Sequence, residues 1–319
     1  MNTGGRVKEM FREPRMEAAP TCTIILRCKN SAHEIGLALA ALFSQEYQDF
    51  ELLVIDSGST DGTLDIVSAY PHRLIRIAPQ DYVPGRVLNR GVAENKSPIC
   101  VFLNSDCVLL CPQALERLVQ AFDDPEVVAA FARQVARPEA WSWVRREYLA
   151  SFPVIGPAPS WIELSLPFAA MRRTAWNEQH FYEEAWGSED TAWGYRAHAR
   201  GWKIKYVPNA LVMHSHNYTL RQLYGRRFIE GEADSFIYGG TNQTARIILR
   251  AFGQTFRDWI ADIRDRSYAD IPLAPLRRFV DAWGYIKGAR HGTGRKKAGL
   301  VDISHGQKIV LDRHVSKRS

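Results

Sequence analysis

Short apolar runs alternate with stretches of helical periodicity along the first part of the chain. Unbroken apolar runs of this length predict buried strands, whereas apolar positions three and four residues apart predict helices. Strand and helix in repeated alternation are typical of an α/β domain with a mostly parallel central sheet and flanking helices. The predicted strands are residues 23–27, 51–56, 74–77 and 99–103, and the predicted helices are Ile35–Phe43, 63–70 and 85–95.

The pattern continues less regularly through the middle of the chain. Residues 141–161 are rich in Pro and aromatic residues without a clear period, which predicts a loop over a cleft. Ser31 and Glu34 have the spacing of a capping box at the start of the first helix, and helical periodicity dominates from Leu220 onward. Further predicted strands are Val127–Val135, 166–171, 203–207 and 210–214, and further predicted helices are 112–123, 174–177 and 190–200.

Acidic and histidine residues follow several of these predicted strands. Asp56 ends the second strand, Asp106 follows the fourth, Glu189 and Asp190 begin a helix, and His214 and His216 follow a later strand. Each position alone has an ordinary explanation, as a turn or cap residue, a helix N-terminal charge or a buried histidine. Ligands bind at the carboxyl ends of parallel strands, so the recurrence of acidic and histidine residues after these strands indicates a functional site.

Four segments carry these residues: Val-Ile-Asp-Ser-Gly-Ser-Thr-Asp-Gly-Thr at 54–63, Phe-Leu-Asn-Ser-Asp at 102–106, Glu-Asp-Thr-Ala-Trp-Gly-Tyr-Arg at 189–196 and Val-Met-His-Ser-His-Asn-Tyr at 212–218. Together they resemble the family 2 glycosyltransferases, which have the GT-A fold, over roughly residues 21–238. The segment Pro-Gly-Arg-Val-Leu-Asn-Arg-Gly at 84–91 and the His-Ser-His-Asn-Tyr stretch most resemble rhamnosyltransferase-type members that build bacterial polysaccharides.

The resemblance implies a binding site for a nucleotide-diphosphate sugar, either dTDP-rhamnose or a UDP-sugar. Asp56 would accept hydrogen bonds from the nucleobase or ribose. Arg86 and Asn89 would contact the diphosphate or the base, although a role on the helix surface fits them equally well. The residues implied at this site are Asp56, Ser57, Arg86, Asn89, Asn104, Ser105 and Asp106.

The resemblance also implies a divalent cation and a general base. Asp106 ends the Asp-x-Asp signature, whose first position is Asn104 here, and would bind Mn²⁺ or Mg²⁺ bridging the two phosphates. His214 or His216 would complete the metal site, and an imidazole ligand favours Mn²⁺ modestly. Asp190 would remove the proton of the acceptor hydroxyl in an inverting transfer.

Two tryptophans flank the predicted base. Trp186 and Trp193 are either a platform for the acceptor sugar or part of the core. The Gln-x-x-Arg-Trp motif of processive members is absent, so we expect addition of a single sugar to a glycan or lipid-linked acceptor.

The predicted organisation has three parts: a disordered leader over residues 1–20, a GT-A catalytic domain over 21–240, and a helical, basic extension over 241–319. From Arg246 to the end the chain has 16 Lys and Arg against 7 Asp and Glu. Residues 244–266 and 276–286 predict amphipathic helices. Their apolar stripes either pack on the catalytic domain or on a second subunit of a homodimer, or lie on an anionic membrane as a peripheral contact.

Other classes fit the sequence less well. No apolar run reaches 18 residues, so no transmembrane helix is expected. The five cysteines lack a Cys-x-x-Cys spacing, which favours reduced cysteines over a disulfide framework or a zinc site. We therefore expect a cytoplasmic protein, at most peripheral on the inner face of the plasma membrane. No Gly-x-Gly-x-x-Gly follows the first strand, which argues against a Rossmann oxidoreductase. The aromatic residues of the tail have helical spacing, so no nucleic-acid partner is expected. A nucleotidyltransferase and a non-catalytic scaffold remain alternatives.

Overall fold

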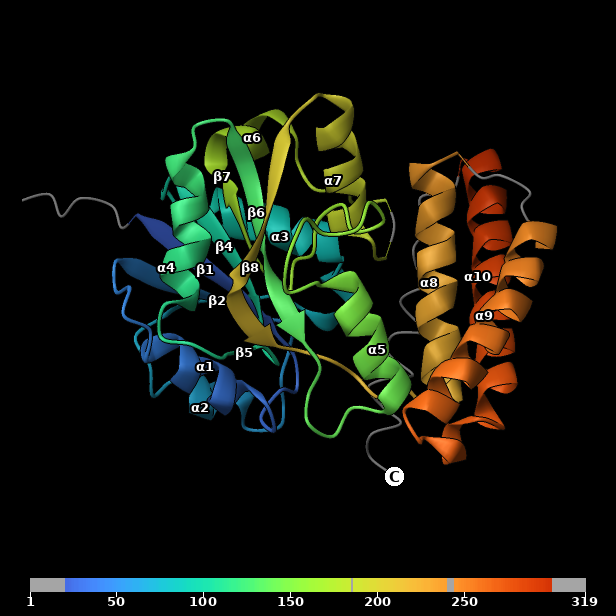
Figure 1. The fold of residues 1–319 in the computed structure, drawn as a ribbon. Helices are drawn as coiled ribbons and strands as arrows, with labels where there is room; N and C mark the ends of the chain where they lie inside the picture. Colours follow the sequence, from blue (N-terminus) through green and yellow to red (C-terminus); the bar gives the residue numbers. More distant parts are fainter. Residues whose placement is uncertain (1–20, 185, 240–243, 300–319) are drawn as a thin grey trace, which may run out of the picture.

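The computed structural model describes residues 21–184, 186–239 and 244–299. The predicted leader and the last basic residues of the chain lie outside these ranges. One eight-stranded sheet forms the centre of the molecule (Figure 1). Its strands are β1 (Cys22–Cys28), β2 (Phe50–Asp56), β3 (Arg73–Arg76), β4 (Ile99–Asn104), β5 (Val108–Leu109), β6 (Val127–Val135), β7 (Phe168–Arg172) and β8 (Lys203–Met213).

The sheet is mixed, with the spatial order β3-β2-β1-β4-β7-β6-β8-β5. β3, β2, β1 and β4 pair in parallel, as do β6 and β8. β7 is antiparallel to both β4 and β6, and β5 is antiparallel to β8. The two short strands predicted near the end of the sheet form the single strand β8, whose register against β6 shifts between Ala132 and Arg133.

Helices cover both faces of this sheet, so the inner strands bury their side chains on both sides. In β1, Ile24 and Leu26 contribute to one core cluster and Ile25 to the other. The flanking helices and turns are α1 (Ile35–Phe43), α2 (Thr63–Val67), η1 (Pro79–Asp81), α3 (Pro84–Ala93), α4 (Ala114–Val119), η2 (Gln120–Asp123), α5 (Ser142–Ser151), α6 (Arg173–Glu178) and α7 (Glu189–Ala199).

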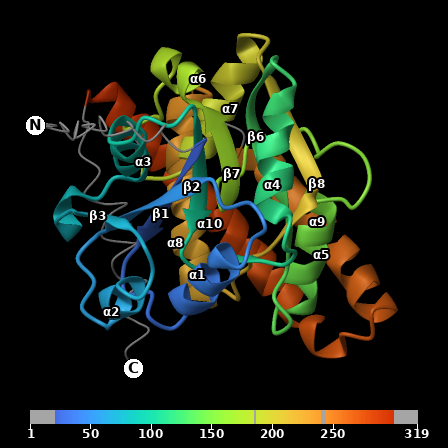
Figure 2. The ribbon, with the colours of Figure 1, turned by 90° about the vertical axis from the view of Figure 1, so that its left-hand side faces the viewer.

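A second layer of helices lies beside the sheet: α8 (Leu220–Ile237), α9 (Thr244–Arg264), η3 (Tyr268–Asp270) and α10 (Leu273–Lys297) (Figures 1 and 2). Gly284 and Gly288, one turn apart on α10, allow the backbones of α8 and α10 to approach closely. A Cβ atom at Gly288 would lie 1.9 Å from the carbonyl oxygen of Phe228. Within the described part of the chain, no helix has the length and apolar character needed to cross a membrane.

The loop predicted over residues 141–161 was wrong in its first half, which forms α5. Trp143 and Val144 are buried, and Tyr148, one turn further on, packs against the same cluster. Arg146 forms an ion pair with Asp262 of α9. The helix is stabilised by partners more than a hundred residues away, which a local pattern does not report.

The capping box predicted at Ser31 and Glu34 was also wrong. The carbonyl oxygen of Ser31 accepts hydrogen bonds from the backbone N–H groups of Glu34 and Ile35, and no side chain caps α1. The Ser31 hydroxyl lies instead 3.0 Å from the hydroxyl of Ser105. Ser31 therefore connects the start of α1 to the end of β4.

Candidate active site

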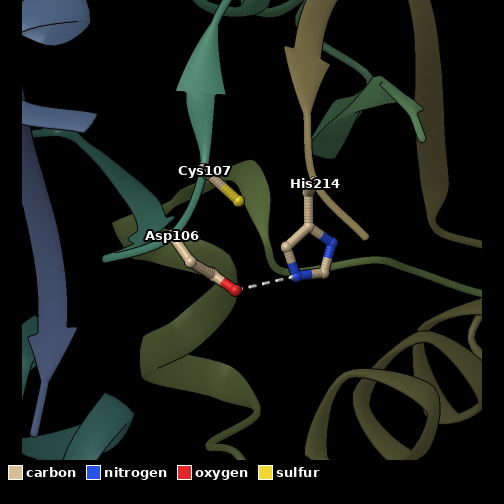
Figure 3. A group of neighbouring side chains, drawn as sticks. All are labelled: Asp106, Cys107 and His214. Atoms are coloured by element: carbon tan, nitrogen blue, oxygen red, sulfur yellow. Dashed lines mark ion pairs between the residues drawn. The ribbon is translucent and has the colours of Figure 1, made fainter. Parts of the chain in front are cut away.

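The ends of two strands bring the predicted metal ligands together. β4 ends at Asn104, two residues before Asp106, and β8 ends at Met213, one residue before His214. The short edge strand β5, which follows Asp106 in the sequence, pairs antiparallel with β8, with Val108 opposite Met213. This pairing places Asp106 and His214 side by side, although they are far apart in the sequence (Figure 3).

The carboxylate of Asp106 faces two imidazole rings. Its Oδ2 lies 3.2 Å from Nε2 of His216 and 3.7 Å from Nε2 of His214. The two rings are perpendicular, with centroids 4.9 Å apart, and the His216 ring stacks on Tyr218. Asp106 and His214 are buried. Both imidazole rings therefore lie against the same carboxylate.

The hydrogen bonds around His214 place a proton on Nδ1 of its ring. The Gln134 amide nitrogen donates to the hydroxyl of Ser165 at 2.7 Å, so its carbonyl oxygen faces Nδ1 of His214 at 2.8 Å and accepts a hydrogen bond from it. A neutral ring with its proton on Nδ1 presents the lone pair of Nε2 to the Asp106 carboxylate. Two electron-rich atoms that face each other are stabilised by a cation between them, and this arrangement is typical of metal-binding histidines.

Cys107 lies in the same group, with its sulfur within 4.8 Å of the ligand atoms of Asp106 and His214 (Figure 3). Burial, followed by the charge of Asp106, raises the pKa of this thiol well above its usual value. A protonated thiol is a poor ligand for hard cations. Of the three grouped side chains, Asp106 and His214 therefore suit a hard cation better than Cys107, and His216 contacts the same carboxylate.

Asp190 lies in the first turn of α7. Its carboxylate accepts hydrogen bonds from the backbone N–H groups of Thr191 at 2.8 Å and Leu166 at 3.5 Å. Burial, followed by the negative charge of Glu189, raises the pKa of Asp190 to about 6. A carboxylate with this pKa is deprotonated near neutral pH and still basic enough to accept a proton from a hydroxyl group.

Arg27, at the end of β1, is a site residue that the sequence analysis did not identify. Its guanidinium lies 3.1 Å from the carboxylate of Glu189 and 3.5 Å from the side-chain oxygen of Asn104. It thereby joins the start of α7 to the end of β4. The available signal was a cation at the carboxyl end of an otherwise apolar strand.

The predicted nucleotide-binding residues divide into two groups. Ser57, Asn104 and Ser105 line the same cavity as Asp106, and the Ser57 hydroxyl is buried without a hydrogen-bond partner among the described residues. Asp56 is buried, and its carboxylate accepts hydrogen bonds from the backbone N–H groups of Gly58 and Ser59. Asp56 therefore fixes the turn that presents Ser57.

Arg86 and Asn89 lie on α3, outside the residues that line this cavity. Arg86 is largely exposed and pairs with Glu183 at 3.5 Å. The side chain of Asn89 is buried. Its oxygen accepts hydrogen bonds from the indole of Trp176 and the backbone N–H of Phe181. Its nitrogen donates hydrogen bonds to the Glu183 carboxylate and the Phe181 carbonyl, so Asn89 holds the neighbouring loop in place.

Of the two predicted platform residues, Trp193 is fully buried and its indole donates to the Gln179 carbonyl, so it is part of the core. Trp186 is also buried, but it lines the cavity and packs on Tyr82.

A cavity of about 2370 Å³ is lined by Asp190 and by Asp106, His214 and His216, which are here called the Asp106 cluster. The sheet and α5 form one side, and α8, α9 and α10 contribute to the other. Arg226 of α8, also missed from the sequence, pairs with Glu230 at 2.9 Å and lies over the Tyr218 ring. The cavity is large enough for a nucleotide sugar together with an acceptor.

Comparison with known proteins relates this site to one family. The sequence model of the family described as "Glycosyl transferase family 2" matches residues 23–190. The chain is 32% identical over 264 residues to the O-antigen chain rhamnosyltransferase WbaN of Salmonella anatum, covering 78% of this chain and 82% of that protein. It is 30% identical over 282 residues to the O-antigen chain rhamnosyltransferase RfbN of Salmonella typhimurium, covering 83% and 88%.

Solved structures of low sequence identity share the fold. The mannosyltransferase PcManGT from Pyrobaculum calidifontis, in complex with GDP-Man and Mn²⁺, is similar with a TM-score of 0.53 and 18% identity, covering 94% of this chain and 81% of that one. S. aureus TarS 1–349 in complex with UDP gives a TM-score of 0.52 and 17% identity, covering 88% and 92%. The mixed sheet with flanking helices is the GT-A fold predicted from the sequence.

Proposed function

The chain belongs to glycosyl transferase family 2, and we propose that it is an inverting, metal-dependent, non-processive glycosyltransferase. It moves one sugar from a nucleotide-diphosphate sugar to a hydroxyl group of a glycan or lipid-linked acceptor in polysaccharide biosynthesis. The observation that supports this most directly is that one cavity is lined both by the Asp106 cluster and by a separate carboxylate, Asp190, whose pKa is raised to about 6.

Donor binding involves two sets of residues. Asp106, His214 and His216 would hold Mn²⁺ or Mg²⁺, which when bound stabilises negative charge on the diphosphate. Ser57, Asn104 and Ser105 line the cavity beside this cluster, and Asn104 and Ser105 present amide and hydroxyl groups to the nucleotide. Arg27 fixes the position of Asn104. The chain thus orients the donor with its diphosphate at the end of β4.

Asp190 acts as the general base. Its carboxylate takes the proton of the acceptor hydroxyl while that oxygen forms a bond to the anomeric carbon of the donor. The bond between this carbon and the diphosphate oxygen breaks, and its electron pair leaves with the nucleoside diphosphate. Attack from the face opposite the leaving group inverts the anomeric centre. Positioned proton removal contributes about 10²–10⁴-fold to such a rate.

The donor is dTDP-rhamnose or a UDP-sugar, and the acceptor belongs to a bacterial cell-surface polysaccharide. Support comes from the two rhamnosyltransferases of O-antigen chains, which match over most of their length. A lipid-linked acceptor would bring the enzyme to the cytoplasmic face of a membrane, with the C-terminal helices as the peripheral contact. A homodimer through these helices is the alternative.

Two measurements test the proposal. Asp190→Asn is expected to abolish sugar transfer while nucleotide binding stays close to wild type, because an amide does not accept the proton. Asp124→Asn is the matched control, since Asp124 pairs with Lys203 at the opposite end of β8 from His214. Nuclear magnetic resonance of the product is expected to show an inverted anomeric centre. Near-wild-type transfer by Asp190→Asn would rule out this base, and a retained configuration would rule out the mechanism.

A further inference from the structure

The outer side of α9 carries large apolar side chains in contact with solvent. Their spacing of one, three and four residues places them on one stripe of the helix. Exposed apolar residues continue along the chain through η3 into α10, and this many large apolar side chains in solvent indicate an interaction site. The α9 stripe, 43–71% exposed, consists of Ile248, Leu249, Phe252, Phe256, Ile260 and Ile263, and the continuation consists of Tyr268, Leu273, Leu276, Phe279 and Trp283.

Arginines follow the edge of this stripe. Arg246, Arg250 and Arg257 are spaced four and seven residues apart, which places them along one line of α9 beside the apolar side chains. On α10 the ammonium group of Lys287 lies over the ring of the exposed Trp283. The stripe therefore has a basic margin.

The carboxylates of the same helices are engaged elsewhere in the chain. In the described residues 244–299, each of the five Asp side chains bonds to another side chain of this protein. Their partners are Arg277 and Arg278 for Asp258, Arg146 for Asp262, Arg146 and Arg264 for Asp265, Ser142 for Asp270, and Arg227 for Asp281. These contacts leave the margin of the stripe positively charged.

We infer that this face, here called the α9–α10 face, binds the surface of an anionic lipid bilayer. The apolar stripe enters the boundary between headgroups and acyl chains, and the arginines contact the lipid phosphates. A symmetric dimer through the same face would offer these arginines no new carboxylate, because an isologous interface apposes the same patch on both subunits and the Asp side chains of residues 244–299 are already bonded within the chain. Charge complementarity thus favours an anionic membrane over a second copy.

The same helix also borders the active-site cavity. Arg246, Ile247 and Arg250 of α9 line the cavity that contains Asp106 and Asp190. A helix that lies on the bilayer is therefore also a wall of the cavity, so an acceptor anchored in that bilayer has a short path to the site. This inference rests on the lipid-linked acceptor of the proposed function and adds the residues that contact the membrane.

Co-sedimentation with vesicles tests the inference without any substrate. Wild-type protein is expected to bind vesicles of phosphatidylcholine with about 30% phosphatidylglycerol, and to bind much less to pure phosphatidylcholine or at high salt. The double variant Phe252→Ser, Phe256→Ser is expected to lose about tenfold or more in partitioning, because two aromatic rings no longer enter the interface. Arg257→Gln is expected to lose about fivefold on anionic vesicles only.

A matched control separates this face from general hydrophobicity. Leu249→Ser on α9 and Leu37→Ser on α1 remove the same side chain at exposures of 71% and 61%. Only Leu249→Ser is expected to weaken vesicle binding, with both variants retaining the wild-type unfolding temperature. Equal binding by wild type and the Phe252, Phe256 double variant would overturn the inference. A wild-type dimer by light scattering that the double variant converts to a monomer would overturn it too, and would assign the face to a second copy. Because nucleotide binding and transfer are measured separately, failure here leaves the proposed function standing.

Discussion

Replacing Glu189 with glutamine is expected to move the acid limb of the pH–rate profile to lower pH. Asp190 must be deprotonated to act as a base, so the rate rises with pH through its pKa, which burial and the charge of Glu189 raise to about 6. Glu189→Gln removes that charge. It also removes the negative charge that lies 3.1 Å from the Arg27 guanidinium. The positive charge of Arg27 then favours the ionised form of Asp190 further.

The size of the expected shift is that of one neighbouring charge. The pKa of Asp190 is raised from 3.8, with burial as the larger cause and Glu189 as the second. A neighbouring charge that contributes about 1 kcal/mol moves a pKa by about 0.7 unit. At pH 5 about a tenth of the wild-type carboxylates are ionised, whereas a pKa lowered by 0.7 unit gives about a third. The rate at pH 5, relative to the plateau, is therefore expected to rise about threefold.

Initial rates of nucleoside diphosphate release, measured from pH 4.5 to 8, provide the assay. Mn²⁺ is held saturating at every pH, so that its loss from His214 and His216 does not produce the limb. Glu178→Gln is the control, because Glu178 pairs with Arg200 on the surface and its loss should leave the limb in place. An acid limb that stays unchanged in Glu189→Gln would refute the assignment of the limb to Asp190.

Two further predictions concern the metal site and the helical layer. Gln134→Leu removes the acceptor of the His214 Nδ1 proton and is expected to weaken Mn²⁺ binding about 10–100-fold in a metal titration. The control Gln134→Glu keeps an acceptor and should bind Mn²⁺ nearly as tightly as wild type. Equal Mn²⁺ affinity in Gln134→Leu and wild type would show that this hydrogen bond does not orient the ring. Gly288→Ala places a Cβ atom 1.9 Å from the Phe228 carbonyl oxygen and is expected to cost about 1–3 kcal/mol and lower the unfolding temperature. Gly294→Ala, on the same helix with nothing within 4 Å, should not lower it; equal temperatures would contradict the close packing of α8 on α10.

The sequence predicts the sheet and the metal cluster for related reasons. Apolar runs identify the strands of a parallel sheet, and the carboxyl ends of parallel strands meet at one edge. Asp106 and His214 follow two such strands, and the structure places Oδ2 of Asp106 3.7 Å from Nε2 of His214. His216 follows the same strand as His214, and its ring lies against the same carboxylate. Residues at strand ends could be placed because the topology determines where those ends lie.

Residues on helices and loops were harder to place. Asn89 lies in a segment that resembles the family, but its side chain forms hydrogen bonds with Trp176 and Phe181, which are 87 and 92 residues away in the sequence. A local pattern does not state which partners a helix face meets. Arg27 was overlooked for the same reason, since its role depends on Glu189. The helix over Ser142–Ser151 depends on contacts with α9.

Calorimetric titration with UDP, dTDP and GDP, each with and without Mn²⁺, tests the central claim most directly. Wild type and the control Asp124→Ala are expected to bind one of the three nucleotides in a metal-dependent manner, and Asp106→Ala is expected to lose that binding while remaining folded. The nucleotide that binds identifies the donor class. Binding that is equal with and without Mn²⁺ and unchanged in Asp106→Ala would contradict a metal-dependent donor site at Asp106, His214 and His216.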